Sequence, residues 1–310
     1  MTGAATDVVT FGETMASLRG EGPLRLGATM ALSVGGTETN VAIGLARLGH
    51  AVRWVGRVGD DELGALVLRT LRAEGVDVAA AQVDPERATG LMLREHRVGN
   101  VIRVQYYRSG SAGGAITADD VLPALDGARI LHVTGVTPAL DPAAADAVRA
   151  AIARARSLGL LVSFDVNYRS RLWPPATAGQ VLRPLIGDVD VLFASADELP
   201  LVADDPAELL AAGVRDVVIK HGGDGAECHT ADGKVSVPAR AVPVVDVVGA
   251  GDAFVAGYLS GVLDGAGPHE RLERGAVAGA FVVARPGDWE GLPTRAELPL
   301  LDAAEGTTFR

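Results

Sequence analysis

Apolar runs suited to β-strands alternate with helical patterns along most of this chain, and this alternation limits its possible folds more than any other feature. One strand-like run, residues 160–164, is almost continuously apolar, which indicates burial on both faces. Such alternation is typical of a mostly parallel sheet covered by helices on both faces, so we predict a doubly wound α/β fold. The expected strands are residues 7–11, 51–56, 129–134, 160–166, 189–193 and 214–220, and the expected helices are residues 40–48, 60–74, 141–157, 178–186 and 204–212.

Two segments break this alternation, at about residues 13–33 and 88–108. Both contain extended runs with partly alternating side chains, such as residues 90–95 and 101–107. These runs predict a small β-structure added to the α/β fold. Because no low-complexity linker divides the chain, we expect residues 1–310 to form a single domain with the two segments inserted.

Charge and composition argue against several classes of protein. The net charge is −11 and no basic tract occurs, which makes nucleic acid an unsuitable partner. No uncharged apolar run approaches the about 18 residues of a membrane span, and the start of the chain lacks the charged and apolar regions of a secretion signal. The single cysteine, Cys228, rules out an internal disulfide. We therefore expect a cytoplasmic protein that acts on small molecules.

Residues 246–254 combine two glycines with an acidic residue at the start of a helical pattern. Gly249, Ala250 and Gly251 would lie at the mouth of this helix, where unpaired N–H groups and the helix dipole attract anions. Asp252 would repel a resting phosphate there, but it could take a proton from a hydroxyl that attacks the phosphate. The alternative is that Asp252 only caps the helix, because acidic residues favour a first turn.

A second motif covers residues 35–49. It begins with a glycine turn at Gly35 and Gly36, continues as a short amphipathic helix and ends at Gly49. Asn40 is expected to be the N-cap of this helix, because its side-chain oxygen can accept a hydrogen bond from a first-turn N–H group.

Together with residues 56–64, the two motifs resemble the PfkB/ribokinase family of carbohydrate kinases in order and spacing, over about residues 7–291. The resemblance implies a ribokinase-like fold in which the two extended segments form a β lid over the sugar site, often shared in a dimer. The alternative is a surface extension without a catalytic role. The resemblance also implies phosphoryl transfer from ATP, with Mg²⁺, to a sugar hydroxyl. The sequence has neither a P-loop nor a protein-kinase signature.

This resemblance gives the glycine-rich helix start a catalytic role. Asp252 would be the base, and Gly249, Ala250 and Gly251 would donate N–H groups to the transition-state oxygens. Without the resemblance, residues 220–225 would be interpreted as an ordinary β-hairpin turn. With it, the expected ATP-binding residues are Asn167, Ser195, Lys220, Gly222, Gly223, Gly225, Gly249 and Gly251.

The resemblance also implies a water-mediated contact between Glu198 and Mg²⁺, since the family has a glutamate there in an Asn-x-x-Glu motif. Ser195 replaces the asparagine of that motif, which leaves its contribution open. Val247 and Val248 replace a threonine-containing pair of many relatives. The sequence therefore gives little support for the monovalent-cation (K⁺) site of those relatives.

Two arginines, Arg108 and Arg169, stand at the expected sugar side of the site. Two guanidinium groups facing one pocket suit an acidic sugar, because each can pair with a carboxylate through two hydrogen bonds. The alternative is surface ion pairing. Residues 106–113, 131–140 and 165–169 resemble those of bacterial 2-keto-3-deoxygluconate kinases within the family. This resemblance implies substrate contacts from Gly35, Gly36, Asn40, Met92, Tyr106, Arg108, Arg169, Asp252 and Asp288.

Three positions near this pocket leave alternatives open. Met92 stands where an aromatic contact is expected, which could change selectivity among keto-deoxy acids. Asp288 either closes the site near the C-terminus or lies in an exposed turn. Arg171 is a further candidate for the pocket.

The sequence thus predicts an ATP- and Mg²⁺-dependent kinase that phosphorylates 2-keto-3-deoxygluconate, a sugar acid, at its terminal hydroxyl. The nearest alternative is the same chemistry on 2-keto-3-deoxygalactonate, fructose, ribose or a nucleoside. Another is a sensor of sugar or nucleotide that keeps the fold without catalysis, although the intact sequence at 249–252 argues against it. A homodimer or higher homo-oligomer through the lid is a further expectation.

Overall fold

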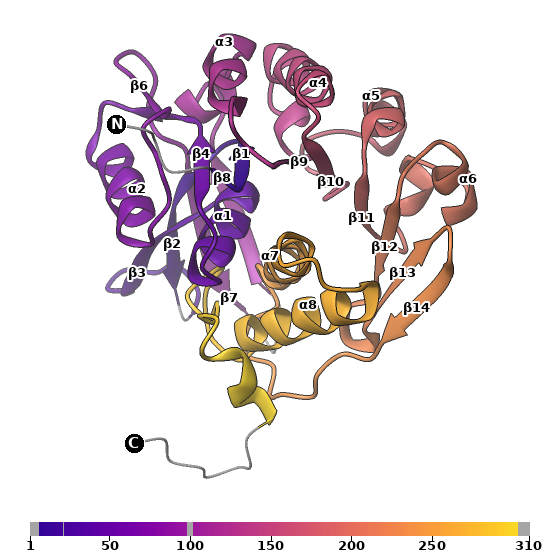
Figure 1. The fold of residues 1–310 in the computed structure, drawn as a ribbon. Coiled ribbons are helices and arrows are strands. Elements are labelled where there is room, and N and C mark those ends of the chain that lie inside the picture. Colours follow the sequence, from indigo (N-terminus) through magenta and orange to yellow (C-terminus); the bar gives the residue numbers. More distant parts are fainter. Residues whose placement is uncertain (1–5, 21, 98–101, 303–310) are drawn as a thin grey trace.

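The computed structural model describes residues 6–20, 22–97 and 102–302. Its largest element is an eight-stranded sheet with the order β14-β13-β12-β11-β10-β9-β1-β4 (Figure 1). The strands from β4 to β12 in this order are parallel, while β13 and β14 form an antiparallel edge. All six predicted strands are confirmed. The strands are β1 (Val8–Phe11), β4 (Val52–Val55), β9 (Ile130–Thr134), β10 (Leu161–Asp165), β11 (Val191–Ser195), β12 (Asp216–Lys220), β13 (Ala226–Thr230) and β14 (Gly233–Val237).

Helices cover both faces of this sheet, as predicted (Figure 1). Neighbouring strand residues such as Val8 and Val9 belong to two different cores, because successive side chains point to opposite faces. One core includes residues of α3 (Ala118–Val121), α4 (Pro142–Ser157), α5 (Pro175–Leu182) and α6 (Pro206–Ala211). The other includes residues of α1 (Thr37–Arg47), α2 (Glu62–Ala73), α7 (Ala250–Leu263) and α8 (Pro268–Val283).

The prediction that Asn40 caps α1 is wrong. The helix begins at Thr37 with Gly36 as its N-cap, and the Asn40 N–H already donates to the Gly36 carbonyl at 2.8 Å. Gly36 can hold this position because its backbone packs against Glu13 and Thr14, where a Cβ would not fit. Asn40 therefore lies inside the first turns, and its side chain is free for another partner.

The predicted helix at 178–186 also differs from the structure. The α-helix α5 begins at Pro175, whose missing N–H group costs nothing in a first turn. It gives way at Arg183 to a 3₁₀-helix (Arg183–Asp188) because Pro184 has no N–H group to continue the α-helical bonding. The helix α8 and the strands β13 and β14 were not predicted.

The two inserted segments form a separate four-stranded sheet in the order β3-β2-β7-β8, which we call the lid. Its strands are β2 (Met15–Gly20), β3 (Met30–Gly35), β7 (Leu91–His96) and β8 (Ile102–Tyr107), and a small further sheet pairs β5 (Arg57–Gly59) with β6 (Gln82–Asp84). Residues 21 and 98–101 of the segments lie outside the described residues. The single-domain organisation and a dimer through the lid stay predictions.

Among residues 6–20, 22–97 and 102–302, the structure contains no helix whose length and apolar character would let it cross a membrane.

Candidate active site

The predicted site residues converge on one cavity of about 560 Å³. It lies where the lid faces the carboxyl ends of parallel strands and the start of α7, the edge at which doubly wound sheets bind ligands. Ala250, Gly223 and Gly225 are the predicted residues that do not line it. Those that do are Gly35, Gly36, Asn40, Met92, Tyr106, Arg108, Asn167, Arg169, Ser195, Glu198, Lys220, Gly222, Gly249, Gly251, Asp252 and Asp288.

The glycine-rich start of α7 has the geometry that the sequence predicts. Gly249 is the N-cap with a left-handed backbone (φ 79°), and the helix begins at Ala250. A Cβ at position 249 would collide with the carbonyl oxygen of Asp288, so only glycine fits both the backbone angle and the space. Gly249 and Gly251 therefore line the cavity in a fixed position, while the Ala250 N–H donates to the Val247 carbonyl at 3.4 Å.

Asp252 lies in the first turn of α7 and is buried, with 6% of its surface exposed. Its carboxylate accepts hydrogen bonds from Thr37 Oγ1 at 2.6 Å and from Asn40 Nδ2 at 2.7 Å. A third donor, Asn167 Nδ2, lies 3.3 Å away. These donors come from other parts of the chain, so Asp252 does more than cap its own helix. They leave the carboxylate oriented by three fixed groups at the cavity wall.

One of these donors, Thr37, carries a signal in the sequence, and another, Asn167, has an unusual backbone. Thr37 was not predicted, although it precedes Asn40 by three residues and must share a face of α1 with it. Asn167 has a positive φ of 38°, which is rare outside glycine and is often kept at functional sites. The strained backbone lets the Asn167 amide reach both Asp252 and the Thr37 hydroxyl, the latter at 2.6 Å.

Lys220 brings a positive charge to the same end of the cavity. Its Nζ lies 2.8 Å from both carboxylate oxygens of Asp165, which is fully buried at the end of β10. Burial raises the pKa of Asp165 to about 6, although Lys220 opposes this rise. The ammonium also faces the start of α7, since a Cβ on Gly251 would lie 3.8 Å from it. Lys220 is thus held where an anion at the helix mouth would meet it.

The loop after β11 holds Glu198 rigidly at the cavity. Its Oε1 accepts the Tyr168 N–H at 2.7 Å and its Oε2 accepts the Ser195 N–H at 2.8 Å. Across the described part of the chain, no cluster of three or more His, Cys, Asp or Glu side chains could ligate a metal. A lone carboxylate with both oxygens already engaged fits a water-mediated contact with Mg²⁺ better than direct ligation.

The residues after β12 form a hairpin turn to the antiparallel strand β13. This is the structure expected for residues 220–225 without the family resemblance. The turn is nevertheless part of the site, because Gly222 lines the cavity. Gly223 and Gly225 lie outside the cavity wall. Val247 and Val248, which were not predicted, line the same cavity.

The two predicted arginines differ in their surroundings. Arg108 forms an ion pair with Glu13, whose side chain is only 1% exposed, and its guanidinium lies 5.5 Å from the Tyr106 ring centre. Glu13 Oε1 also accepts the Ser111 hydroxyl at 2.6 Å. Arg169 is exposed and has no ion-pair partner among the described residues. Arg108 therefore already has an ion-pair partner, although a buried one, and Arg169 is the better placed to receive a new anion.

A larger outer cavity of about 1030 Å³ continues from this point and shares Glu13, Tyr106, Arg108 and Arg169 with the inner one. Arg171 lines only the outer cavity and donates to the Val104 carbonyl at 2.6 Å.

Glu13 was not predicted, although it follows the end of β1 and so stands at the ligand-binding edge of the sheet.

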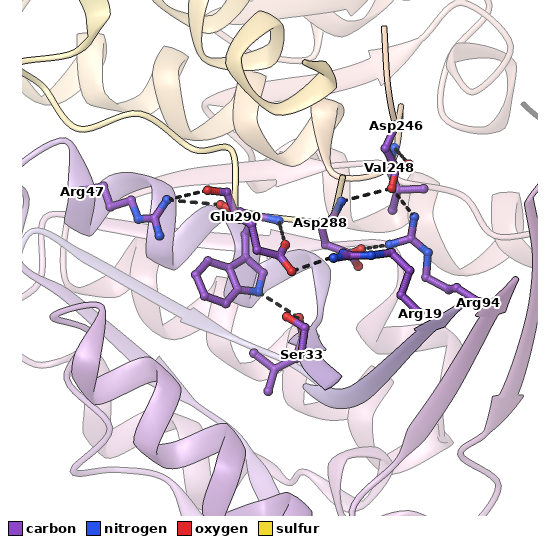
Figure 2. Close-up of polar contacts among 11 residues, drawn as sticks. Arg19, Ser33, Arg47, Arg94, Asp246, Val248, Asp288 and Glu290 are labelled. Carbon is purple, nitrogen blue, oxygen red and sulfur yellow. Dashed lines mark hydrogen bonds and ion pairs between the residues drawn. The ribbon is translucent and has the colours of Figure 1, made fainter. Parts of the chain in front are cut away.

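Asp288 lies at the cavity wall, and the interpretation as an exposed turn is wrong, since only 7% of the residue is exposed. It pairs with the buried Arg94 of β7, which was not predicted (Figure 2). Burial raises the pKa of Asp288 to about 7, against the lowering effect of Arg94. The carboxylate also lies against Gly35, where a Cβ would be 2.7 Å from Oδ2.

Comparison with known proteins agrees with this geometry. Residues 5–295 match the pfkB family of carbohydrate kinases. The chain is 37% identical to the 2-dehydro-3-deoxygluconokinase of Bacillus subtilis (strain 168), with 98% of each chain covered. It is also 37% identical to the enzyme of that name from Thermoproteus tenax, with 95% of this chain and 93% of the relative covered. The crystal structure of a PfkB protein from Polaromonas sp. JS666 superposes with a TM-score of 0.86 at 36% identity, covering 97% of this chain and 100% of the other. The chain therefore belongs to the pfkB family of carbohydrate kinases.

Proposed function

We propose that this carbohydrate kinase transfers the γ-phosphoryl group of ATP to the terminal primary hydroxyl of 2-keto-3-deoxygluconate, also called 2-dehydro-3-deoxygluconate. The observation that carries the proposal is a single cavity with two groups in its wall: Asp252 at the start of α7, and the guanidinium of Arg169, which has no ion-pair partner in the described part of the chain. A base for a hydroxyl and a cation for a carboxylate together suit a sugar acid. The two relatives at 37% identity carry the matching name.

In this proposal, Asp252 accepts the proton of the terminal hydroxyl as its oxygen attacks the γ-phosphorus. The bond from that phosphorus to the bridging oxygen breaks, and ADP leaves. The N–H groups at Gly249, Ala250 and Gly251 bind the oxygens of the transferring group, where negative charge is largest in the transition state. Lys220 adds a positive charge at the same place. Thr37, Asn40 and Asn167 keep the Asp252 carboxylate aimed at the hydroxyl.

The nucleotide enters as its Mg²⁺ complex, a co-substrate. Glu198 is the acidic side chain that we expect to hold this Mg²⁺ through water, because its oxygens are fixed by two backbone N–H groups. We also expect Asn167, Ser195 and Gly222, together with the neighbouring turn glycines Gly223 and Gly225, to lie along the nucleotide. When bound, Mg²⁺ would neutralise part of the phosphate charge beside Lys220.

The variant Arg169→Ala tests the sugar-acid part of this proposal. We expect KM for 2-keto-3-deoxygluconate to rise about 10- to 100-fold, the value of a lost charge-assisted hydrogen bond, with kcat nearly unchanged. Steady-state kinetics at saturating Mg-ATP measure both constants. Arg171→Ala is the matched control, because Arg171 lies in the same loop but outside the inner cavity. Equal effects of the two variants, or none from Arg169→Ala, would refute the carboxylate contact.

We further propose that catalysis does not depend on K⁺. The Asp246 carboxylate near the start of α7 accepts hydrogen bonds from Arg94 Nη2 at 2.7 Å and from the N–H groups of Val248 and Gly287. The buried guanidinium would repel a second cation at this carboxylate. The rate in potassium chloride should therefore equal that in tetramethylammonium chloride at the same ionic strength. A clear stimulation by K⁺ would contradict this expectation.

A further inference from the structure

A buried charge network joins the lid to the loops around the start of α7. Arg94, at the centre of the lid on β7, is 1% exposed and lies between Asp246 and Asp288 (Figure 2). Its Nη2 lies 2.7 Å from Asp246 Oδ2, and its Nη1 contacts Asp288 Oδ1. Neither aspartate is near Arg94 in sequence, since 152 and 194 residues separate them. The guanidinium therefore links three distant segments.

Both aspartates fix the backbone next to the phosphate-facing glycine. Asp246 Oδ1 accepts the Val248 N–H at 3.1 Å, one residue before Gly249, and Asp246 Oδ2 accepts the Gly287 N–H at 3.2 Å. The carbonyl of Asp288 backs directly onto Gly249. Any change in the position of the guanidinium would therefore move the two loops that determine where Gly249 points.

The strand that carries Arg94 also reaches the proposed sugar pocket. Met92, on the same strand and two residues before Arg94, faces the cavity with it and pairs in register with Tyr106 of β8. A ligand that moves or orders β7 would act on Arg94 through this rigid strand.

The charges of the network are also unequal, because one buried guanidinium meets two buried carboxylates. The charged groups that face Asp288 are Arg94, Asp246, Asp252 and Glu290, and three of these four are acidic. Arg94 pairs with both Asp246 and Asp288, so removing its guanidinium would leave these buried carboxylates without that partner, which is costly. The two carboxylates thus hold the guanidinium of Arg94 in place, and the guanidinium in turn holds Asp246 and Asp288 in place.

We propose that Arg94 is a positioning residue that couples binding of the sugar under the lid to the geometry of the N–H groups at the start of α7. It does not touch the reacting atoms in this account. It transmits the position of the lid to Gly249 through Asp246 and Asp288. The identity of the sugar in the test rests on the function proposed above.

Coupling between two ligands is reciprocal and can be measured at equilibrium. The probes are the non-hydrolysable Mg-AMPPNP and 2-keto-3,6-dideoxygluconate, which lacks the hydroxyl that accepts the phosphoryl group. Calorimetry gives Kd for Mg-AMPPNP with and without the saturating sugar acid. We expect the sugar acid to tighten nucleotide binding about tenfold in the unmodified protein and to have almost no effect in Arg94→Lys. A lysine keeps the positive charge but cannot contact both carboxylates as a planar fork does.

Arg19→Met is the matched control. Arg19 also belongs to the lid and pairs with Glu290 of the same C-terminal loop at 3.3 Å, but it has no contact with Asp246 (Figure 2). We expect it to keep the coupling and kcat even if it lowers the melting temperature. Arg94→Met serves as a second variant, with the same expected loss of coupling as Arg94→Lys.

Two results would overturn the inference. One is full coupling in a folded Arg94 variant whose melting temperature alone has fallen, because a purely structural residue gives that result. The other is an unmodified protein that binds both probes without coupling. Failure of the unmodified protein to bind the sugar acid contradicts the proposed substrate instead, and the coupling is then measured with an unreactive analogue of the sugar that is turned over.

Discussion

Replacing Asp252 by asparagine should lower kcat by about 10²- to 10⁴-fold, the usual contribution of a general base, while the affinity for the sugar acid changes little. The asparagine has the same shape, but Thr37 and Asn40 donate to different oxygens of the carboxylate, so the amide keeps an acceptor for only one of them. Its amide group cannot accept the proton of the attacking hydroxyl. Steady-state kinetics with Mg-ATP measure the rate, and calorimetric titration of the sugar acid measures binding.

Asp264→Asn is a suitable control for this variant. Asp264 is the C-cap of the same helix, at the end far from the cavity, where it pairs with Arg274 and Arg295. These exposed pairs contribute at most modestly to stability, so kcat should not change. If Asp252→Asn lost binding and rate in parallel, Asp252 would be a binding or structural residue, and its assignment as the base would be wrong.

Gly249→Ala is expected to have an effect of similar size by a different route. The added Cβ would collide with the Asp288 carbonyl, and alanine disfavours the left-handed backbone at φ 79°. The loop must shift, and the N–H groups at the start of α7 shift with it. Because misplacement by about 1 Å can cost about 10²-fold in rate, we expect kcat to fall at least this far. The measurement is kcat at a temperature well below the melting transition.

The same helix provides the control for the glycine variant. Gly265, just after the C-terminus of α7, has nearly the same backbone angle (φ 76°), but a Cβ there meets no atom within 4 Å. Gly265→Ala should lower the free energy of unfolding by about 1 kcal/mol and leave kcat unchanged. Equal losses of rate in the two variants would show that backbone strain, and not the geometry at the start of the helix, causes the effect.

The strands and most helices could be predicted because their signals are local. Runs such as residues 160–164 are apolar because both faces of a parallel strand are buried, and β10 is found there. The helix α8 was missed because part of its contact with α7 is made by small residues. At Gly275, for example, a Cβ would meet the Phe254 ring and carbonyl, and such a residue adds little to an apolar pattern.

Residues of the candidate site could be predicted where a sequence motif or the end of a strand marks them. Their contacts with residues distant in sequence could not. Asn40 was identified as important, but its role as a cap was wrong because its partner, Asp252, lies 212 residues away. The ion pairs of Arg108 with Glu13 and of Arg94 with Asp288 were not predicted for the same reason, because their partners are distant in sequence. Spacing within a motif cannot show which charges the fold brings together.

The measurement that tests the central claim most directly is ADP release from Mg-ATP in the presence of different acceptors. The acceptors are 2-keto-3-deoxygluconate, its galactonate epimer, fructose and ribose. We expect turnover with the keto-deoxy acids, fastest with the gluconate form, and almost none with the neutral sugars. Preference for fructose or ribose would leave the kinase family and the role of Asp252 in place but would contradict the assignment of Arg169 to a substrate carboxylate.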